Sequence, residues 1–122
     1  MQDFYYRKLI VYQLSMQLLA DVYNLTKKFP PQESLGLTNQ IQRAAVSIPS
    51  NIAEGMGRFS VKERIHFLEI SNGSLMEVMC QIEIAHMLGY ITADDLQLQE
   101  QKIAALAKMK IGLRKNLEEK NK

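Results

Sequence analysis

The sequence lacks the paired cysteines that stabilise small secreted proteins and the long apolar runs that direct a chain into a membrane. Its 122 residues contain no tryptophan, three prolines and one cysteine. With Cys80 alone, no intrachain disulfide can form, and nothing indicates an oxidising compartment. No stretch reaches the roughly 18 apolar residues of a membrane span, and the first residues lack the apolar run of a signal peptide. We therefore expect a cytoplasmic protein with no membrane partner.

Signals for β-strands are also nearly absent, because no segment sustains an alternation of apolar and polar residues. Apolar residues make up 47% of the chain and charged residues 23%, which is ordinary for a soluble domain. The length suits one domain spanning residues 1–122. These values exclude a disordered chain and favour a single modest hydrophobic core.

Apolar residues recur at helical spacing, and local start and stop signals divide the chain into four expected helices. The expected spans are residues 5–28, 34–56, 60–88 and 92–117. The signals at their ends are a proline pair, three capping residues and one glutamate: Pro30-Pro31, Ser34, Ser60 with Glu63, and Thr92. Four helices with short connections predict an all-α, antiparallel up-and-down four-helix bundle.

The second expected helix contains Pro49, within the stretch SIPSNIAEGMGRFS at residues 47–60. The apolar residues on either side keep helical phase across the proline, which predicts a kinked but continuous helix. Proline removes one backbone N–H from the helix, so Asn51 is a candidate to compensate, with a bond to another helix as one possibility. Gly55 and Gly57 are expected to turn the chain after the helix ends.

The third expected helix is apolar over a wide arc. At about 100° per residue its apolar side chains cover roughly 200° of the circumference, whereas one buried stripe needs little more than 100°. Ile65, Met76 and Met87 lie on the outer flank of this arc. The surplus indicates an interface between copies of the chain. The alternative is a few exposed methionines, which a monomer tolerates.

Residues that could support catalysis do not come together in the sequence. His66 and His86 each complete an E-x-x-H motif, but at about 1.5 Å per residue they lie about 30 Å apart on one helix. They cannot share a metal within one chain. Cys80 has no adjacent base, and no phosphate-binding glycine motif follows a strand. We therefore expect no catalytic residue, no metal, no cofactor and no enzymatic activity.

Basic residues near the proline stretch are the remaining candidates for function. The nucleic-acid contacts that we expect are Arg43, Arg58, Lys62 and Arg64. Arg58 and Lys62 flank the start of the third helix, where free backbone N–H groups favour an anion. Glu54 and Glu63 are close enough to pair with these cations instead, and the sequence leaves both readings open. Lys27 and Lys28 form a second basic group, but no aromatic residue interleaves with either group as in a base-stacking platform.

One run of residues is more specific. QRAAVSIPSNIAEG at residues 42–55, followed by Gly57 and Arg58, resembles the signature of the four helix bundle proteins encoded by intervening sequences in bacterial 23S ribosomal RNA genes. Pro49, Asn51, Glu54 and Gly55 all fall within this run. The similarity covers most of the chain, and its further matches are LTKKFP at 25–30, GSL at 73–75 with Glu77, and LGY at 88–90.

The resemblance implies an antiparallel four-helix bundle that assembles into a ring-like homopentamer. The family is also similar to accessory proteins of diversity-generating retroelements, which bind nucleic acid and a reverse transcriptase through a basic pentameric surface. The net charge of +2 per chain becomes +10 in a pentamer. One hypothesis is therefore a non-enzymatic oligomer that binds RNA or DNA, with a protein such as a reverse transcriptase as a further partner. The other is a protein–protein interaction scaffold that binds no nucleic acid.

Overall fold

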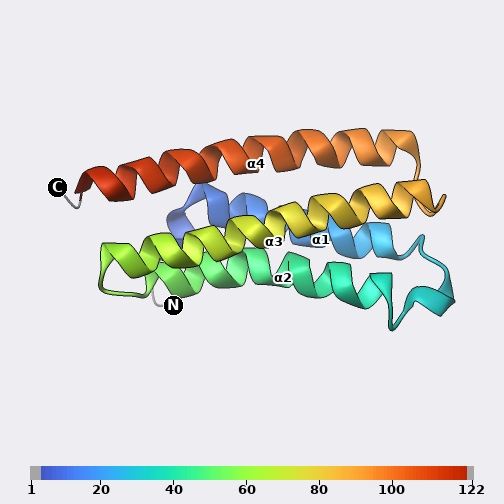
Figure 1. The fold of residues 1–122 in the computed structure, drawn as a ribbon, viewed down its shortest axis with the longest axis horizontal. Coiled ribbons are helices and arrows are strands. Elements are labelled where there is room, and N and C mark those ends of the chain that lie inside the picture. Colours follow the sequence, from blue (N-terminus) through green and yellow to red (C-terminus); the bar gives the residue numbers. More distant parts are fainter. Residues whose placement is uncertain (1–3, 121–122) are drawn as a thin grey trace.

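The computed structural model describes residues 4–120, and all regular structure in that range is helical. The four long helices are α1 (Ile10–Thr26), α2 (Leu37–Met56), α3 (Val61–Met87) and α4 (Ala93–Lys120). Two short 3₁₀ helices, η1 (Tyr5–Lys8) and η2 (Pro31–Glu33), precede α1 and α2. The long helices lie side by side and alternate in direction (Figure 1), which confirms the expected all-α bundle. Residues 1–3 and 121–122 of the expected domain lie outside the described residues.

The core consists of one apolar stripe from each long helix. α2 and α3 share the largest helix–helix interface, and the interface between α1 and α4 is the smallest of the four. The apolar side chains that are almost fully buried are Val22, Ile41, Ile48, Ile52, Leu75, Val78, Ile82, Ile103 and Leu106. Each contributes about 1.5–3 kcal/mol through removal of apolar surface from water, so these stripes hold the bundle together.

The structure corrects the start of the first helix. The expectation of one helix over residues 5–28 is wrong because Leu9 takes an extended conformation between η1 and α1. Leu9 packs against the apolar core, and the edge of Tyr6 meets the ring of Tyr12 at 4.9 Å between centroids. The helix is interrupted at Leu9, and η1 packs against α1 and α2.

The expected cap of the second helix is also wrong. α2 begins at Leu37, and Ser34 lies outside it, at the end of η2. The acceptor at this helix start is Glu33, whose Oε1 receives the N–H of Leu37 at 3.2 Å. The other oxygen of Glu33 accepts a hydrogen bond from the Tyr90 hydroxyl at 2.8 Å, and this bond raises the pKa of Tyr90. One glutamate therefore fixes both a helix start and the connection between α3 and α4.

The two glycines after Pro49 do not act as left-handed turn residues. Gly55 lies inside α2 and is buried, and Gly57 has a φ of −84°, which any residue can adopt. Among residues 4–120, Gly89 alone has a positive φ, +80°. It follows α3, where a left-handed glycine commonly ends a helix. Gly55 is a glycine for reasons of packing rather than backbone conformation.

Pro49 is buried inside α2, and the helix continues through it, as its sequence phase predicts; the bend itself stays a prediction. The amide of Asn51 donates to the carbonyl oxygen and to Oγ of Ser47, each at 2.8 Å. Asn51 therefore bonds within its own helix and does not cross to another. Ser47 in turn links to α3, because its Oγ lies 2.9 Å from Oγ of Ser74.

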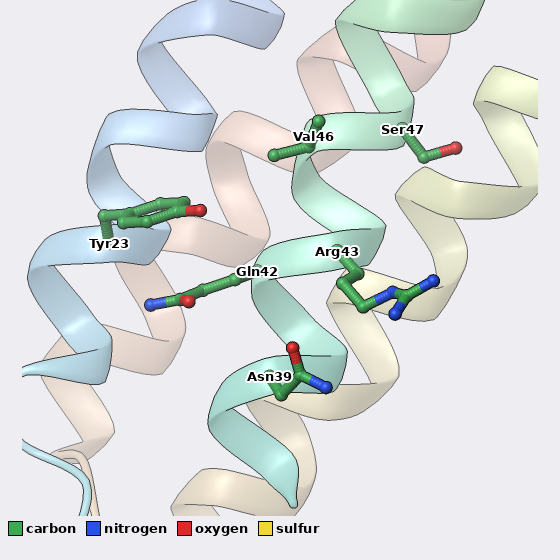
Figure 2. Close-up of a pocket in the computed structure, with 6 residues that line it drawn as sticks. All are labelled: Tyr23, Asn39, Gln42, Arg43, Val46 and Ser47. Atoms are coloured by element: carbon green, nitrogen blue, oxygen red, sulfur yellow. The ribbon is translucent and has the colours of Figure 1, made fainter. Parts of the chain in front are cut away.

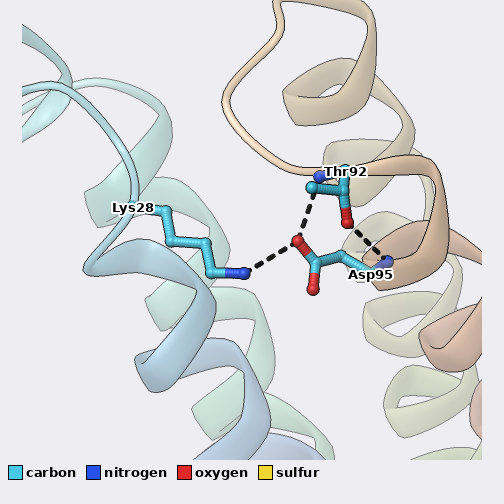
Figure 3. Close-up of polar contacts among 3 residues, drawn as sticks. All are labelled: Lys28, Thr92 and Asp95. Atoms are coloured by element: carbon cyan, nitrogen blue, oxygen red, sulfur yellow. Dashed lines mark hydrogen bonds and ion pairs between the residues drawn. The ribbon is translucent and has the colours of Figure 1, made fainter.

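A polar clamp joins the end of α1 to the start of α4 (Figure 3). Thr92 and Asp95 form a reciprocal cap: the N–H of Asp95 donates to Oγ1 of Thr92 at 3.1 Å, and the N–H of Thr92 donates to Oδ2 of Asp95 at 3.0 Å. Nζ of Lys28, just after the end of α1, reaches the same oxygen at 2.9 Å. The bond from Lys28, followed by that from the Thr92 backbone, holds the pKa of Asp95 below its usual value.

We expect Asp95→Ala to lower the free energy of unfolding by about 1 kcal/mol at neutral pH, because it removes the cap and the pairing partner of Lys28. Asp94→Ala is the matched control, since Asp94 occupies the same first turn without such bonds. A carboxylate with a lowered folded-state pKa stabilises above its unfolded value of about 3.9, and this contribution is lost as the pH falls through the folded value. Urea unfolding at neutral and acidic pH measures this. Equal losses in both variants, or a deficit that persists in acid, would contradict the role of the clamp.

Candidate nucleic-acid interface

The basic residues at the α2–α3 turn are largely engaged by the protein itself. Nη2 of Arg58 lies 3.1 Å from Oε1 of Glu54, and its guanidinium sits 4.7 Å from the ring centroid of Phe67. Nε of Arg64 donates to the carbonyl oxygen of Arg58 at 2.8 Å. Arg64 thereby holds the turn, and Arg58 is oriented over an aromatic ring. Of the two interpretations that the sequence leaves open at Arg58, this structure shows the pair with Glu54.

Arg43 and Lys62 differ from these two arginines because their side chains make no hydrogen bond or ion pair with residues 4–120. Both are exposed. Lys62 stands on the first turn of α3, whereas Arg43 lies 15 residues before Arg58 along α2 and its turn, about 22 Å away at ~1.5 Å per residue. The four predicted contacts therefore do not form one patch. They divide into a turn cluster and an isolated arginine in the middle of α2.

A surface groove of about 350 Å³ lies beside Arg43. Its lining comprises one residue of α1 and five of α2: Tyr23, Asn39, Gln42, Arg43, Val46 and Ser47. Figure 2 shows Gln42 and Val46 directed toward the Tyr23 ring, while Arg43 extends toward α3. Nε2 of Gln42 is held by a hydrogen bond to Oγ1 of Thr26 at 3.1 Å. No carboxylate is among the lining residues, so the groove favours a neutral or anionic ligand.

Tyr23 is the residue that sequence reasoning missed. It stands 20 positions before Arg43 in the chain, and the antiparallel packing of α1 on α2 places the two beside one groove. A signal was present, because Tyr23 precedes Lys27 by four residues, which puts the ring and the ammonium group on one face of α1. Lys28, by contrast, is bound to Asp95. The groove therefore combines an aromatic ring from α1 with an arginine from α2.

The other polar residues considered for chemistry remain dispersed. His66 and Cys80 are exposed, and the hydroxyl of Ser47 contacts Ser74 and Asn51 rather than a histidine. Over the described range, no three side chains of His, Cys, Asp or Glu come together as a metal site would require. None of the helices described is long and apolar enough to cross a membrane.

Comparison with known proteins places the bundle in a family. The profile of the 23S rRNA-intervening sequence protein family matches residues 7–112. The chain belongs to this family. No curated protein matches it. The match confirms the resemblance carried by residues 42–55 and extends over all but the two ends of the chain.

A solved structure shares the fold of this family member. It is the crystal structure of a protein of unknown function from the S23 ribosomal protein family of Bacteroides thetaiotaomicron VPI-5482. The TM-score is 0.79 at 24% sequence identity, over 87% of this chain and 99% of that one. The likeness establishes the four-helix architecture.

Proposed function

We propose that this member of the 23S rRNA-intervening sequence protein family is a non-enzymatic oligomer, a homopentamer, that binds RNA or DNA through a basic surface on α2 and α3. The observation that carries the proposal is the exposed, unpaired state of Arg43 within the described residues, beside a groove without carboxylates. Lys62 is unpaired in the same way and adds a second cation. Elsewhere Lys28, Lys102 and Arg114 are neutralised by Asp95, Asp21 and Glu69. A free arginine is well suited to a phosphate group.

Apolar residues that remain exposed on α3 support the assembly part of the proposal. Met76 and Met87, on the outer flank of the wide apolar arc, are both more than a third exposed, as expected if this flank lies against another copy of the chain. Ile65, on the same flank, is instead packed against a small apolar cluster of its own chain. Symmetry in a ring would repeat Arg43 and Lys62 in each subunit and multiply a weak positive charge. Sedimentation equilibrium tests this part: we expect five times the 14.0 kDa mass of the chain, and a monomer would contradict it.

Binding of a fluorescent structured RNA, measured by anisotropy at low and physiological salt, tests the nucleic-acid part. We expect affinity to fall steeply with salt, because each neutralised phosphate releases counterions. Arg43→Gln should weaken binding and flatten the salt dependence. Lys108→Gln, which removes an exposed positive charge from α4, is the control and should have a smaller effect. Absence of binding at low salt overturns the proposal, and equal losses in the two variants would show a response to net charge alone.

A protein–protein scaffold is the second candidate function, and the two ends of the bundle favour it. Phe59 at the α2–α3 turn is fully exposed, and Leu35 before α2 is nearly so. Large apolar side chains in such positions are typical anchors for a protein partner. By analogy with the retroelement accessory proteins, a reverse transcriptase is the kind of partner to test. Capture from the native host that survives nuclease treatment but is lost in Phe59→Ser would support this function.

A further inference from the structure

The groove around Tyr23 combines three features: an exposed aromatic ring, amide groups with hydrogen-bonding capacity to spare, and an arginine without a partner among residues 4–120. Rings that cover a core are buried, whereas Tyr23 is 43% exposed. We infer that this groove binds an unpaired nucleotide of a single-stranded nucleic acid, with the base against Tyr23 and a phosphate on Arg43. The inference rests on the proposed function and specifies the form of nucleic acid that the site accepts.

The apolar part of the groove fits a flat base. The Tyr23 ring lies between α1 and α2, and the Val46 side chain of α2 points toward it (Figure 2). Val46 is itself 41% exposed, so the pair presents an aromatic and an aliphatic surface to solvent. Bases stack on such rings regardless of sequence, because every base has a π-face. Tyr23 therefore supplies the stacking surface that is missing from the linear sequence around the basic residues.

The polar part of the groove supplies hydrogen-bonding groups for a base edge. The amide of Asn39 is exposed and makes no hydrogen bond with the described residues. Gln42 donates one amide N–H to Oγ1 of Thr26. This bond fixes the amide and leaves its second N–H and its oxygen available. Amides of this kind pair in bidentate fashion with base edges. Because Gln42 is anchored to Thr26, its amide offers a donor and an acceptor in fixed positions.

The charges around the groove select a phosphate. Arg43 is the one cationic residue among those that line the groove, and it has no partner among residues 4–120. Since the lining includes no aspartate or glutamate, nothing in it opposes an anion. By contrast, the groove between α1 and α4 is lined mainly by aliphatic residues, among them Leu9, Met109 and Leu113. Of these two grooves, only the Tyr23 groove has both an aromatic ring and an arginine in its lining.

The arrangement favours a single strand over a duplex for a geometric reason. In a duplex each base is stacked on its neighbours and its Watson–Crick edge is paired, so neither the π-face nor that edge can reach a groove between two helices. A splayed base in a loop or single strand offers both. The Tyr23 side chain and the Arg43 side chain together match one nucleotide. A circular oligomer would repeat this site along a strand.

Anisotropy with a fluorescent single-stranded oligonucleotide and with a blunt-ended, fully paired duplex of the same strand tests the inference. We expect Tyr23→Ala to weaken binding of the single strand about tenfold and to leave binding of the duplex within about twofold. Tyr23→Phe keeps the π-face and should retain single-strand affinity. Tyr5→Ala, which removes another exposed tyrosine from η1, is the matched control. Helicity and melting temperature of each variant establish that the fold is intact.

The outcomes separate the two proposals. If the wild-type protein binds the duplex or the single strand with strong salt dependence but Tyr23→Ala changes the affinity for neither, the Tyr23 site is wrong and the proposed function stands. Equal loss in Tyr23→Ala and Tyr23→Phe, or equal loss for both nucleic acids, also overturns the stacking site. If the wild-type protein binds neither nucleic acid at low salt, the proposed function fails and the inference fails with it.

Discussion

Replacing Gly55 by alanine should lower the free energy of unfolding by about 1–3 kcal/mol, although alanine is the better helix former. Gly55 lies in the last turn of α2, where that helix approaches α3. A Cβ atom at this position would sit 2.7 Å from Cβ of Phe67 and 3.4 Å from the carbonyl oxygen of Arg64. Neither neighbour is the far end of a flexible side chain. The two helices must therefore separate, and the cost exceeds the gain of up to about 1 kcal/mol in helix propensity.

Gly73→Ala provides the matched control for this prediction. Gly73 is also a helical glycine, in the middle of α3, but it is exposed and a Cβ atom there meets nothing within 4 Å. The same substitution should raise the free energy of unfolding by up to about 1 kcal/mol at this site. Chemical unfolding of both variants therefore gives opposite signs. A stabilised Gly55→Ala protein would show that the α2–α3 contact is looser than the structure indicates.

The helices and their buried stripes could be predicted because each long helix carries its own apolar period. Helical spacing located all four, and the caps at Ser60 and Thr92 lie where their local motifs place them. The missed boundaries depend on contacts that local motifs do not encode. Glu33 replaces Ser34 at the start of α2 because its carboxylate also receives Tyr90 from the α3–α4 connection. Gly55 is a glycine because of Phe67 on the next helix.

Only part of the candidate site could be predicted, because the rest depends on contacts between helices that are distant in sequence. Basic residues are visible in any sequence, but whether each is paired depends on packing: Arg58 is bound to Glu54, and Arg43 is not. Tyr23 joins Arg43 only through the packing of α1 on α2. Lys110 was missed even though its phase was visible, since it continues the fourth apolar stripe in steps of three and four. The core stripe of α4 runs through Ile103, Leu106, Lys110 and Leu117.

The second large effect on the free energy of unfolding is expected at Lys110, which is only 2% exposed. Nζ of Lys110 donates to Oγ of Ser71 at 2.8 Å, and Ser71 in turn donates to the carbonyl oxygen of Ile48 at 2.8 Å. This chain of bonds joins α4, α3 and α2, but it contains no carboxylate. Burial without a counter-charge lowers the pKa of Lys110 to about 7. Near neutral pH the core therefore holds an amine at the point of losing its proton.

Lys110→Met should stabilise the protein, because methionine fills a similar space without a charge. The folded-state pKa of Lys110 lies roughly three units below its unfolded value of about 10.4, which corresponds to a cost on the order of 4 kcal/mol below about pH 7. Imperfect packing of the new side chain offsets part of this, so we expect a gain of about 2 kcal/mol at pH 6. Ser71 keeps its bond to Ile48 in the variant, so no buried donor is left without a partner.

The pH dependence of this gain distinguishes a buried charge from ordinary repacking. Between about pH 7 and about pH 10 the unfolded chain holds a proton on Lys110 that the folded chain has lost, so the stability of the wild-type protein rises with pH. Lys110→Met lacks this term, and its advantage should be full at about pH 6 and nearly gone at about pH 10. Groups common to both proteins cancel in the difference. Lys108→Met, at an exposed position on the same helix, should differ from wild type by a constant amount. A Lys110→Met protein that is less stable at every pH would show that the amine is held more favourably than its burial implies.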